Sequence, residues 1–113
     1  MKRRRVLWAR AARRDLDAIV SYLADRSPQA ALSTLDRLEG KAKALVSLAS
    51  RGRVVPELAR LHVLEYRELV IPPYRTIYRV RGPRVLVLVV VDARRSLEDI
   101  LLDRLLRIEG QGQ

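Results

Sequence analysis

An uninterrupted run of seven apolar residues, Val85–Val91 (VLVLVVV), constrains the fold of this chain more than any other feature. The run is rich in β-branched residues and lacks the alternation of apolar and polar residues that a half-buried strand shows. It is also far shorter than the roughly 20 residues that a membrane-spanning helix needs. The run therefore predicts an interior strand of a sheet that is covered on both faces.

Two further strands are predicted just before this run. Residues Tyr66–Ile71 and Tyr74–Val80 contain β-branched and aromatic side chains, and the two prolines between them cannot donate to a ladder, so they mark the connection. A turn with a Gly-Pro pair then leads into the apolar run. A short apolar segment, Val6–Ala9, predicts an additional strand near the N-terminus.

Between the first strand and the others, the apolar spacing becomes that of helices. Residues 11–26 repeat apolar side chains at i, i+3, i+4 and i+7, which places one stripe on an amphipathic helix. Ser27 and Pro28 provide the N-cap and first-turn proline of a second helix that continues to Val46 or Ala49. So short a link predicts an antiparallel hairpin. The two stripes contain Leu16, Ile19, Val20, Leu23, Leu35 and Leu38.

A last amphipathic helix is predicted over Ser96–Ile108, with Ser96 in a capping position. The whole pattern indicates an α+β fold. It consists of an N-terminal strand, an antiparallel helical hairpin packed on a three- to four-stranded, mainly antiparallel twisted sheet, and a C-terminal helix. We expect a single domain over residues 1–113, with a basic arm over 1–5 and a flexible tail over 109–113.

The formal net charge of +10 is concentrated in two places. Residues 1–5 carry four basic groups and no acid, and residues 51–84 carry eight basic and three acidic groups. Such a field favours an acidic partner, either nucleic acid or an acidic protein. The alternative is an arginine-rich surface that only makes the chain soluble.

The composition also bears on the compartment. The chain has no cysteine, which excludes disulfides and thiolate metal sites and fits a reducing cytosol. The segment MKRRR runs into VLWA without the apolar stretch of a secretory signal. We therefore expect a cytoplasmic protein with no membrane association.

Arginines and tyrosines alternate along the two predicted strands around the double proline. On a strand, Arg75 and Arg79 share one face, and in a suitable hairpin register Arg67 would join them. Tyr74 begins the second strand, and Arg94-Arg95 in the loop after the apolar run would reach the same surface. Guanidinium groups in such an array bind phosphates or carboxylates. The alternative is an ordinary solvent-facing side of an antiparallel sheet.

Patterns for other chemistry are absent from the sequence. His62 is the single histidine and has no second ligand nearby. The chain contains no G-x-S-x-G elbow and no glycine-rich phosphate loop. Hydrolase, kinase and metalloenzyme functions are therefore disfavoured, and we expect neither a metal nor another cofactor.

Several segments together resemble a known family. DLDAIVSYLADRSPQAA, RGRVVPEL, YREL, YRTIYRV and VVVDARR are similar to segments of ParE-type toxins of type II toxin–antitoxin systems, within the wider RelE/ParE superfamily. The resemblance covers roughly residues 6–107. It implies a compact α+β toxin that is neutralised by a small antitoxin.

The resemblance leaves two mechanisms open, because the RelE branch cleaves mRNA in the ribosomal A site and the ParE branch poisons DNA gyrase. By alignment of motifs, Arg75 and Arg94 match two arginines of the RelE nucleases, and Arg67 matches one lysine. Leu69 replaces a second lysine, and the tyrosine position falls near Ile100. Loss of that proton-transfer residue favours a gyrase inhibitor without catalytic turnover, with the endoribonuclease as the alternative.

The resemblance also implies an acidic, ParD-like antitoxin and a toxin–antitoxin hetero-oligomer. The predicted helical hairpin offers a groove for an amphipathic partner helix, formed by the six residues of the two stripes. The alternative is that all six belong to the core. A third hypothesis is a non-toxic module that only binds nucleic acid or an acidic partner.

Overall fold

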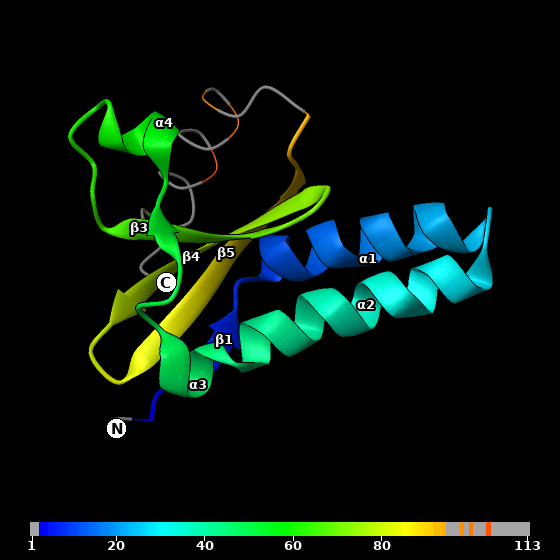
Figure 1. Ribbon diagram of the computed structural model, residues 1–113, viewed down its shortest axis with the longest axis horizontal. Coiled ribbons are helices and arrows are strands. Elements are labelled where there is room, and N and C mark those ends of the chain that lie inside the picture. Colours follow the sequence, from blue (N-terminus) through cyan, green and yellow to red (C-terminus); the bar gives the residue numbers. More distant parts are fainter. Residues whose placement is uncertain (1–2, 95–97, 99, 101–103, 105–113) are drawn as a thin grey trace.

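The computed structural model describes residues 3–94 together with residues 98, 100 and 104, and it shows a mixed α+β fold (Figure 1). The predicted fold class is confirmed. In chain order, the elements are β1 (Arg5–Trp8), α1 (Arg10–Ala24), α2 (Pro28–Lys43), α3 (Leu45–Leu48), β2 (Arg53–Val54), α4 (Pro56–Ala59), β3 (Tyr66–Ile71), β4 (Tyr74–Arg81) and β5 (Arg84–Asp92).

The five strands form one sheet in the order β1-β5-β4-β3-β2. β1 is parallel to β5, and the other neighbours are antiparallel. β5 therefore lies in the interior of the sheet, as its unbroken apolar run predicts. The fifth strand was not expected, because β2 lies in a segment whose glycine and proline predict a loop. Its two residues pair with Glu68 and Arg67 of β3.

Helices α1 and α2 form the predicted antiparallel hairpin and pack together beside the sheet, with α1 against β5 (Figure 1). The Ser27 side chain accepts a hydrogen bond from the Ala30 amide at 3.2 Å, and Pro28 opens α2, so the predicted cap is present. The second helix ends earlier than predicted. A separate turn, α3, follows Ala44 and completes the span that the apolar pattern assigned to one helix.

The core lies between the helical layer and the sheet, and Tyr78 of β4 is its largest fully buried side chain. The Tyr78 hydroxyl donates to the Ala49 carbonyl at 2.7 Å and accepts from the Gly52 amide at 2.9 Å. A Cβ on residue 52 would come within 2.5 Å of that hydroxyl oxygen. Glycine is therefore required at position 52, because the backbone passes directly over the phenol ring.

The second face of the sheet is also partly covered. All residues of Val85–Val91 except Leu86 are buried, which explains why the run lacks alternation. A bulge between β4 and β5 at Ile77 and Tyr78 adds one residue to β5 in this region. The short helix α4 packs through the buried Leu58. The predicted C-terminal helix and tail lie outside the described residues, apart from Glu98, Ile100 and Arg104.

Candidate functional site

The sheet register separates the arginines that the sequence predicts on one face. The two-residue connection pairs Ile71 with Tyr74, so every odd-numbered residue of β3 lies opposite an even-numbered residue of β4. Residues directly opposite each other share a face of the sheet. Arg75 and Arg79, both odd-numbered and on β4, therefore share a face, and Arg67 on β3 lies on the other. The prediction of one common face was wrong for Arg67.

Arg67 instead shares a face with its partner Tyr78, on the side where the helices pack. Its guanidinium is half-buried and donates to the Gly52 carbonyl at 2.7 Å. Tyr78 holds the amide of the same glycine. Arg67 thus braces the loop between α3 and β2, and it lies away from the surface that Arg75 and Arg79 form.

Arg75 lies in a buried cluster of alternating charges. Its Nη1 and Nη2 donate to the two carboxylate oxygens of Glu57 at 2.8 and 2.7 Å, and its Nε donates to Glu68 Oε1 at 2.6 Å. The second oxygen of Glu68 accepts from Arg53 Nε at 2.6 Å. We refer to Arg53, Glu57, Glu68 and Arg75 as the charge cluster. Its two guanidinium groups and two carboxylates neutralise each other.

The geometry of the charge cluster makes Arg75 a structural residue. The side chain of Arg75 is only 9% exposed, and its three donating nitrogens all bind carboxylates. The hydrogen bonds from Arg75 lower the pKa of Glu57 to about 2, against the opposing effect of burial. The same bonds raise the pKa of Arg75 above its ordinary value. The guanidinium of Arg75 is therefore not available to bind an external phosphate.

The other predicted residues of this surface remain accessible to different degrees. The Arg79 guanidinium lies 5.7 Å from the centre of the Tyr66 ring and 3.7 Å from a Glu65 carboxylate oxygen. The exposed Arg94 donates from its backbone amide and its guanidinium to Asp92, at 2.6 to 3.0 Å. This contact raises the pKa of Arg94. Arg95 lies outside the described residues.

Tyr74 lies directly opposite Asp92 in the ladder between β4 and β5. Burial, followed by the nearby Asp92 carboxylate, raises the pKa of its hydroxyl. Tyr74 is therefore a neutral hydrogen-bonding group at physiological pH. Tyr74 and Arg94, which both adjoin Asp92, form one reachable part of the predicted target surface, whereas Arg79 lies on the opposite face of β4.

The six apolar residues predicted to bind an antitoxin divide into two groups. Leu16 and Leu38 are each only 1% exposed and belong to the core, because both helices pack inward through them. A partner cannot reach these two while the helical layer is intact. The remaining four are partly buried: Ile19, Val20 and Leu35 pack against the edge of the core, and Leu23 lies farther along α1.

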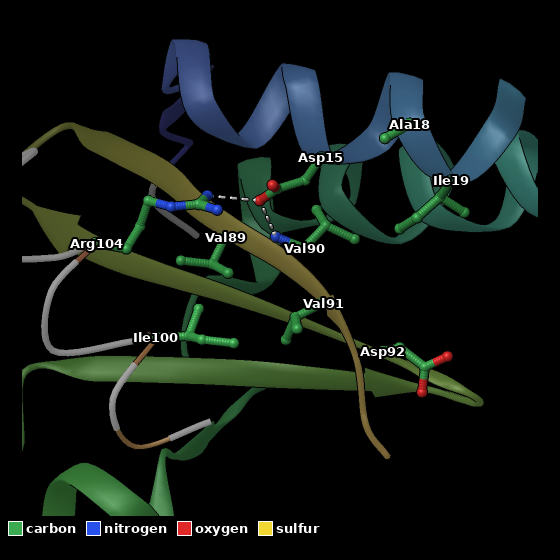
Figure 2. Close-up of a pocket in the computed structure, with 9 residues that line it drawn as sticks. All are labelled: Asp15, Ala18, Ile19, Val89, Val90, Val91, Asp92, Ile100 and Arg104. Carbon is green, nitrogen blue, oxygen red and sulfur yellow. Dashed lines mark hydrogen bonds and ion pairs between the residues drawn. The ribbon is translucent and has the colours of Figure 1, made fainter. Parts of the chain in front are cut away.

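A pocket of about 360 Å³ opens beside this edge of α1 (Figure 2). It lies where β1 has ended and β5 continues alone, since the last β1–β5 pair is Trp8 with Val87. The Val90 amide, left without a strand partner, donates to the Asp15 carboxylate at 3.0 Å. Arg104 donates to the same oxygen at 2.8 Å. The lining consists of Asp15, Ala18, Ile19, Val89, Val90, Val91, Asp92, Ile100 and Arg104.

Sequence reasoning missed the roles of Asp15, Glu57 and Glu68. In the sequence Asp15 looks like a surface ion-pair partner on a helix and the two glutamates have no assigned role, yet each of the three binds a group remote along the chain. The alternation of Tyr66, Glu68 and Val70 placed Glu68 on one face of its strand, but only the register shows that this face meets Arg75. In the described part of the chain, no three potential metal ligands gather, and no helix is long and apolar enough to cross a membrane.

Comparisons with known proteins agree with the fold. The model of a family described as the ParE toxin of the type II toxin–antitoxin system parDE matches residues 6–97. A chain in the chromosomal ParDE toxin–antitoxin system from P. aeruginosa is similar in structure, with a TM-score of 0.65 and 26% identity over 79% of this chain and 95% of that chain. The comparison with curated protein sequences gave no match.

A second solved structure shares the fold at lower identity. It is a chain of the RelBE2 toxin–antitoxin complex from Mycobacterium tuberculosis, with a TM-score of 0.54 and 21% identity over 81% of this chain and 93% of that chain. The family match spans most of the chain, including both helices of the hairpin and all five strands. This chain therefore belongs to the ParE toxin family of type II toxin–antitoxin systems.

Proposed function

We propose that this toxin acts by binding and inhibiting DNA gyrase, and that it does so without cleaving RNA. The observation that carries the proposal is the occupation of Arg75 by Glu57 and Glu68. An RNase of the RelE type needs this arginine to stabilise charge that develops on the scissile phosphate. A guanidinium that is buried and already bound to two carboxylates does not supply that stabilisation.

The absence of a proton-transfer side chain in the C-terminal segment points the same way. Residues 92–113 contain no tyrosine and no histidine. General acid–base catalysis contributes typically about 10²–10⁴-fold to a rate, so a nuclease without it would be slow. Membership of the ParE family favours gyrase as the target, and this target would place the toxin in the cytoplasm.

The reachable pair Tyr74 and Arg94 is our candidate for the contact with gyrase. Arg79 is left out because it lies on the opposite face of the sheet, and Arg67 and Arg75 are left out because they bind the Gly52 carbonyl and two carboxylates. Arg94→Ala removes an exposed guanidinium that is hydrogen-bonded to Asp92, two residues earlier in the chain. This variant is expected to fold like the parent chain and to inhibit gyrase less.

The decisive experiment measures supercoiling by purified bacterial DNA gyrase at increasing toxin concentration. We expect inhibition near stoichiometric toxin, and a several-fold weaker effect with Arg94→Ala. An exposed arginine on the helical hairpin, Arg14, supplies the matched control Arg14→Ala, which should inhibit like the parent. Normal supercoiling in a large excess of folded toxin would refute the proposal. A parallel assay on programmed ribosomes should leave the mRNA intact, and cleavage that depends on Arg94 would establish the endoribonuclease instead.

The second part of the proposal concerns neutralisation. We propose that an acidic, ParD-like antitoxin packs an apolar segment against the edge of α1 that carries Ile19, Val20 and Leu23, of which Ile19 lines the pocket of Figure 2. Both similar structures come from toxin–antitoxin systems, which supports a partner of this kind. The net charge of +10 supports an acidic one.

Ala18 allows a sharp test of this binding site. It is exposed and lines the pocket, so Ala18→Arg fills the space without disturbing the core. We expect at least a tenfold loss of affinity for the antitoxin encoded beside the toxin, measured by titration calorimetry. Ala24→Arg makes the same change at the exposed end of α1, outside the pocket lining, and should bind normally. Equal affinities for both variants would place the antitoxin elsewhere.

A further inference from the structure

One end of the sheet is built from three segments that are remote along the chain. β1, the β4–β5 turn and α3 come together beside the N-terminus, at the lower left of Figure 1. The Arg4 amide donates to the Val46 carbonyl at 2.7 Å, and the Arg5 amide donates to the Pro83 carbonyl at 2.9 Å. Arg4 Nε also donates to the Gly82 carbonyl at 3.1 Å. These bonds fix the N-terminal arm against the turn.

The sequence of these segments is exceptionally one-sided in charge. Residues 1–5, 43–51 and 81–84 contain eight of the 23 lysines and arginines and none of the 13 aspartates and glutamates. The acidic residues are thus all in other parts of the chain. Because the three segments meet at one end of the sheet, the positive field of the molecule is concentrated there.

Within this end, three arginines form a row across the sheet. Arg5 of β1 pairs with Arg84 of β5, and Arg84 pairs with Arg81 of β4. Paired residues share a face, and neighbouring strands are about 4.8 Å apart, so the three side chains leave the sheet side by side. All three are exposed. We call Arg5, Arg81 and Arg84 the arginine row.

The arginine row is unfavourable for folding. Like charges that lie directly opposite each other on neighbouring strands destabilise a sheet. Neither Arg5 nor Arg84 forms an ion pair with a carboxylate in the part of the chain that the structure describes. Arg5 and Arg84 therefore form an exposed pair of like charges on neighbouring strands, and such departures from local consistency occur at sites of function.

We propose that the arginine row binds the phosphodiester backbone of double-stranded DNA. Guanidinium forks match phosphate oxygens, and contacts to phosphates need dense positive charge more than they need apolar pockets. The row lies on the face of the sheet that carries Arg79, away from α1 and α2. The proposed antitoxin site on α1 therefore does not account for it. The inference also holds whichever enzyme the toxin inhibits.

The surroundings of the row fit a nucleic-acid strand that continues past it. A second pocket, of about 490 Å³, lies along the arm and is lined by Arg3, Arg4 and Arg5 together with Val46 and Pro83 among others. A phosphate backbone that crosses the row would thus meet further guanidinium groups at its edge. The number of phosphates neutralised by this surface determines how steeply binding falls with salt.

The test measures binding of the full chain to a fluorescein-labelled 20-base-pair duplex of random sequence, by fluorescence anisotropy between 50 and 200 mM salt. The variant Arg5→Glu/Arg84→Glu reverses two charges of the row. We expect it to weaken binding at least tenfold and to reduce the slope of log K against log salt by roughly 2. Arg5→Lys/Arg84→Lys keeps the charges and should retain most of that slope.

The matched control is Arg14→Glu/Lys41→Glu, which makes the same change in net charge at two exposed positions of the helical layer. It should lose less than threefold in affinity. Circular dichroism and thermal melting check that all variants fold. An equal loss in both glutamate doubles would overturn the proposal, as would a parent chain that does not bind the duplex at 50 mM salt. A polyglutamate peptide that binds the parent chain more tightly than the duplex does, and that loses affinity in Arg5→Glu/Arg84→Glu, would overturn the proposal in favour of an acidic protein partner.

Discussion

The charge cluster and the arginine row occupy the same face of one sheet, yet they use the same side chain in opposite ways. In the cluster, Arg75 is buried and saturated by two carboxylates. In the row, Arg5 and Arg84 are exposed and lie beside other arginines. Removing a partner from the cluster leaves an uncompensated buried charge, whereas removing a charge from the row relieves repulsion. The environment of an arginine therefore decides whether it stabilises the fold or is available to bind.

The largest expected effect is at the carboxylate that two guanidinium groups share. Glu68→Ala removes the partner of both Arg53 and Arg75, and Glu68 is fully buried. We expect the free energy of unfolding to fall by about 2–3 kcal/mol, because the buried Nε of Arg75 loses its acceptor and the charge cluster keeps an excess positive charge. Urea denaturation measures this change. Glu65→Ala, which removes an exposed carboxylate 3.7 Å from Arg79, should cost less than about 1 kcal/mol. An equal loss of unfolding free energy in Glu68→Ala and Glu65→Ala would show that the buried carboxylate stabilises the fold no more than the exposed one.

A smaller effect is expected from pH. Hydrogen bonds from Arg75 lower the pKa of Glu57 from 4.5 to about 2 in the folded chain. This stability is present above pH 4.5 and is lost as the pH falls toward 2. We expect the loss attributable to Glu57 to be roughly 2 kcal/mol, since part of the carboxylate touches solvent.

The check is urea denaturation at pH 5, 4 and 3 for the parent chain and for Glu57→Gln. The variant is less stable at pH 5, but its stability should fall less steeply with acid, because the glutamine does not titrate. Asp36→Asn, on the exposed surface of α2, serves as a control and should follow the slope of the parent. If the free energy of unfolding falls equally steeply with acid in the parent and in Glu57→Gln, Arg75 does not lower the pKa of Glu57.

The smallest effect has the opposite sign. Arg84→Glu places a carboxylate between Arg5 and Arg81 in the arginine row. We expect it to raise the free energy of unfolding by about 0.5 kcal/mol, because opposite charges on neighbouring strands attract. The gain should shrink in 0.5 M salt, where exposed charges are screened. A loss of stability at low salt would mean that the row is not repulsive in the folded chain.

Much of the fold follows from local patterns. The run Val85–Val91 predicted an interior strand, and the apolar stripes with the cap at Ser27 predicted the helical hairpin. These features depend on spacing within one element, which the sequence shows directly. β2 did not follow, because two residues next to a glycine form a strand only through pairing with β3.

The candidate site was less predictable for a related reason. Whether Arg67 and Arg75 share a face of the sheet depends on the length of the connection between β3 and β4. A register shift of one residue between these strands would place the two arginines on the same face. The partners of Arg75 lie 7 and 18 residues away, one of them in the short helix α4 within a segment that reads as a loop. The cost of burying an arginine reveals that partners must exist, but local spacing does not identify them.

Asp15 has a consequence for self-association. Where β1 ends, the open margin of β5 presents backbone groups that form a template for pairing with a strand of a second molecule. The Asp15 carboxylate accepts the amide hydrogen of Val90 at that margin, so the carbonyl of an incoming strand finds this donor already occupied. A single aspartate on a neighbouring helix thus removes one pairing group from the open margin of the sheet.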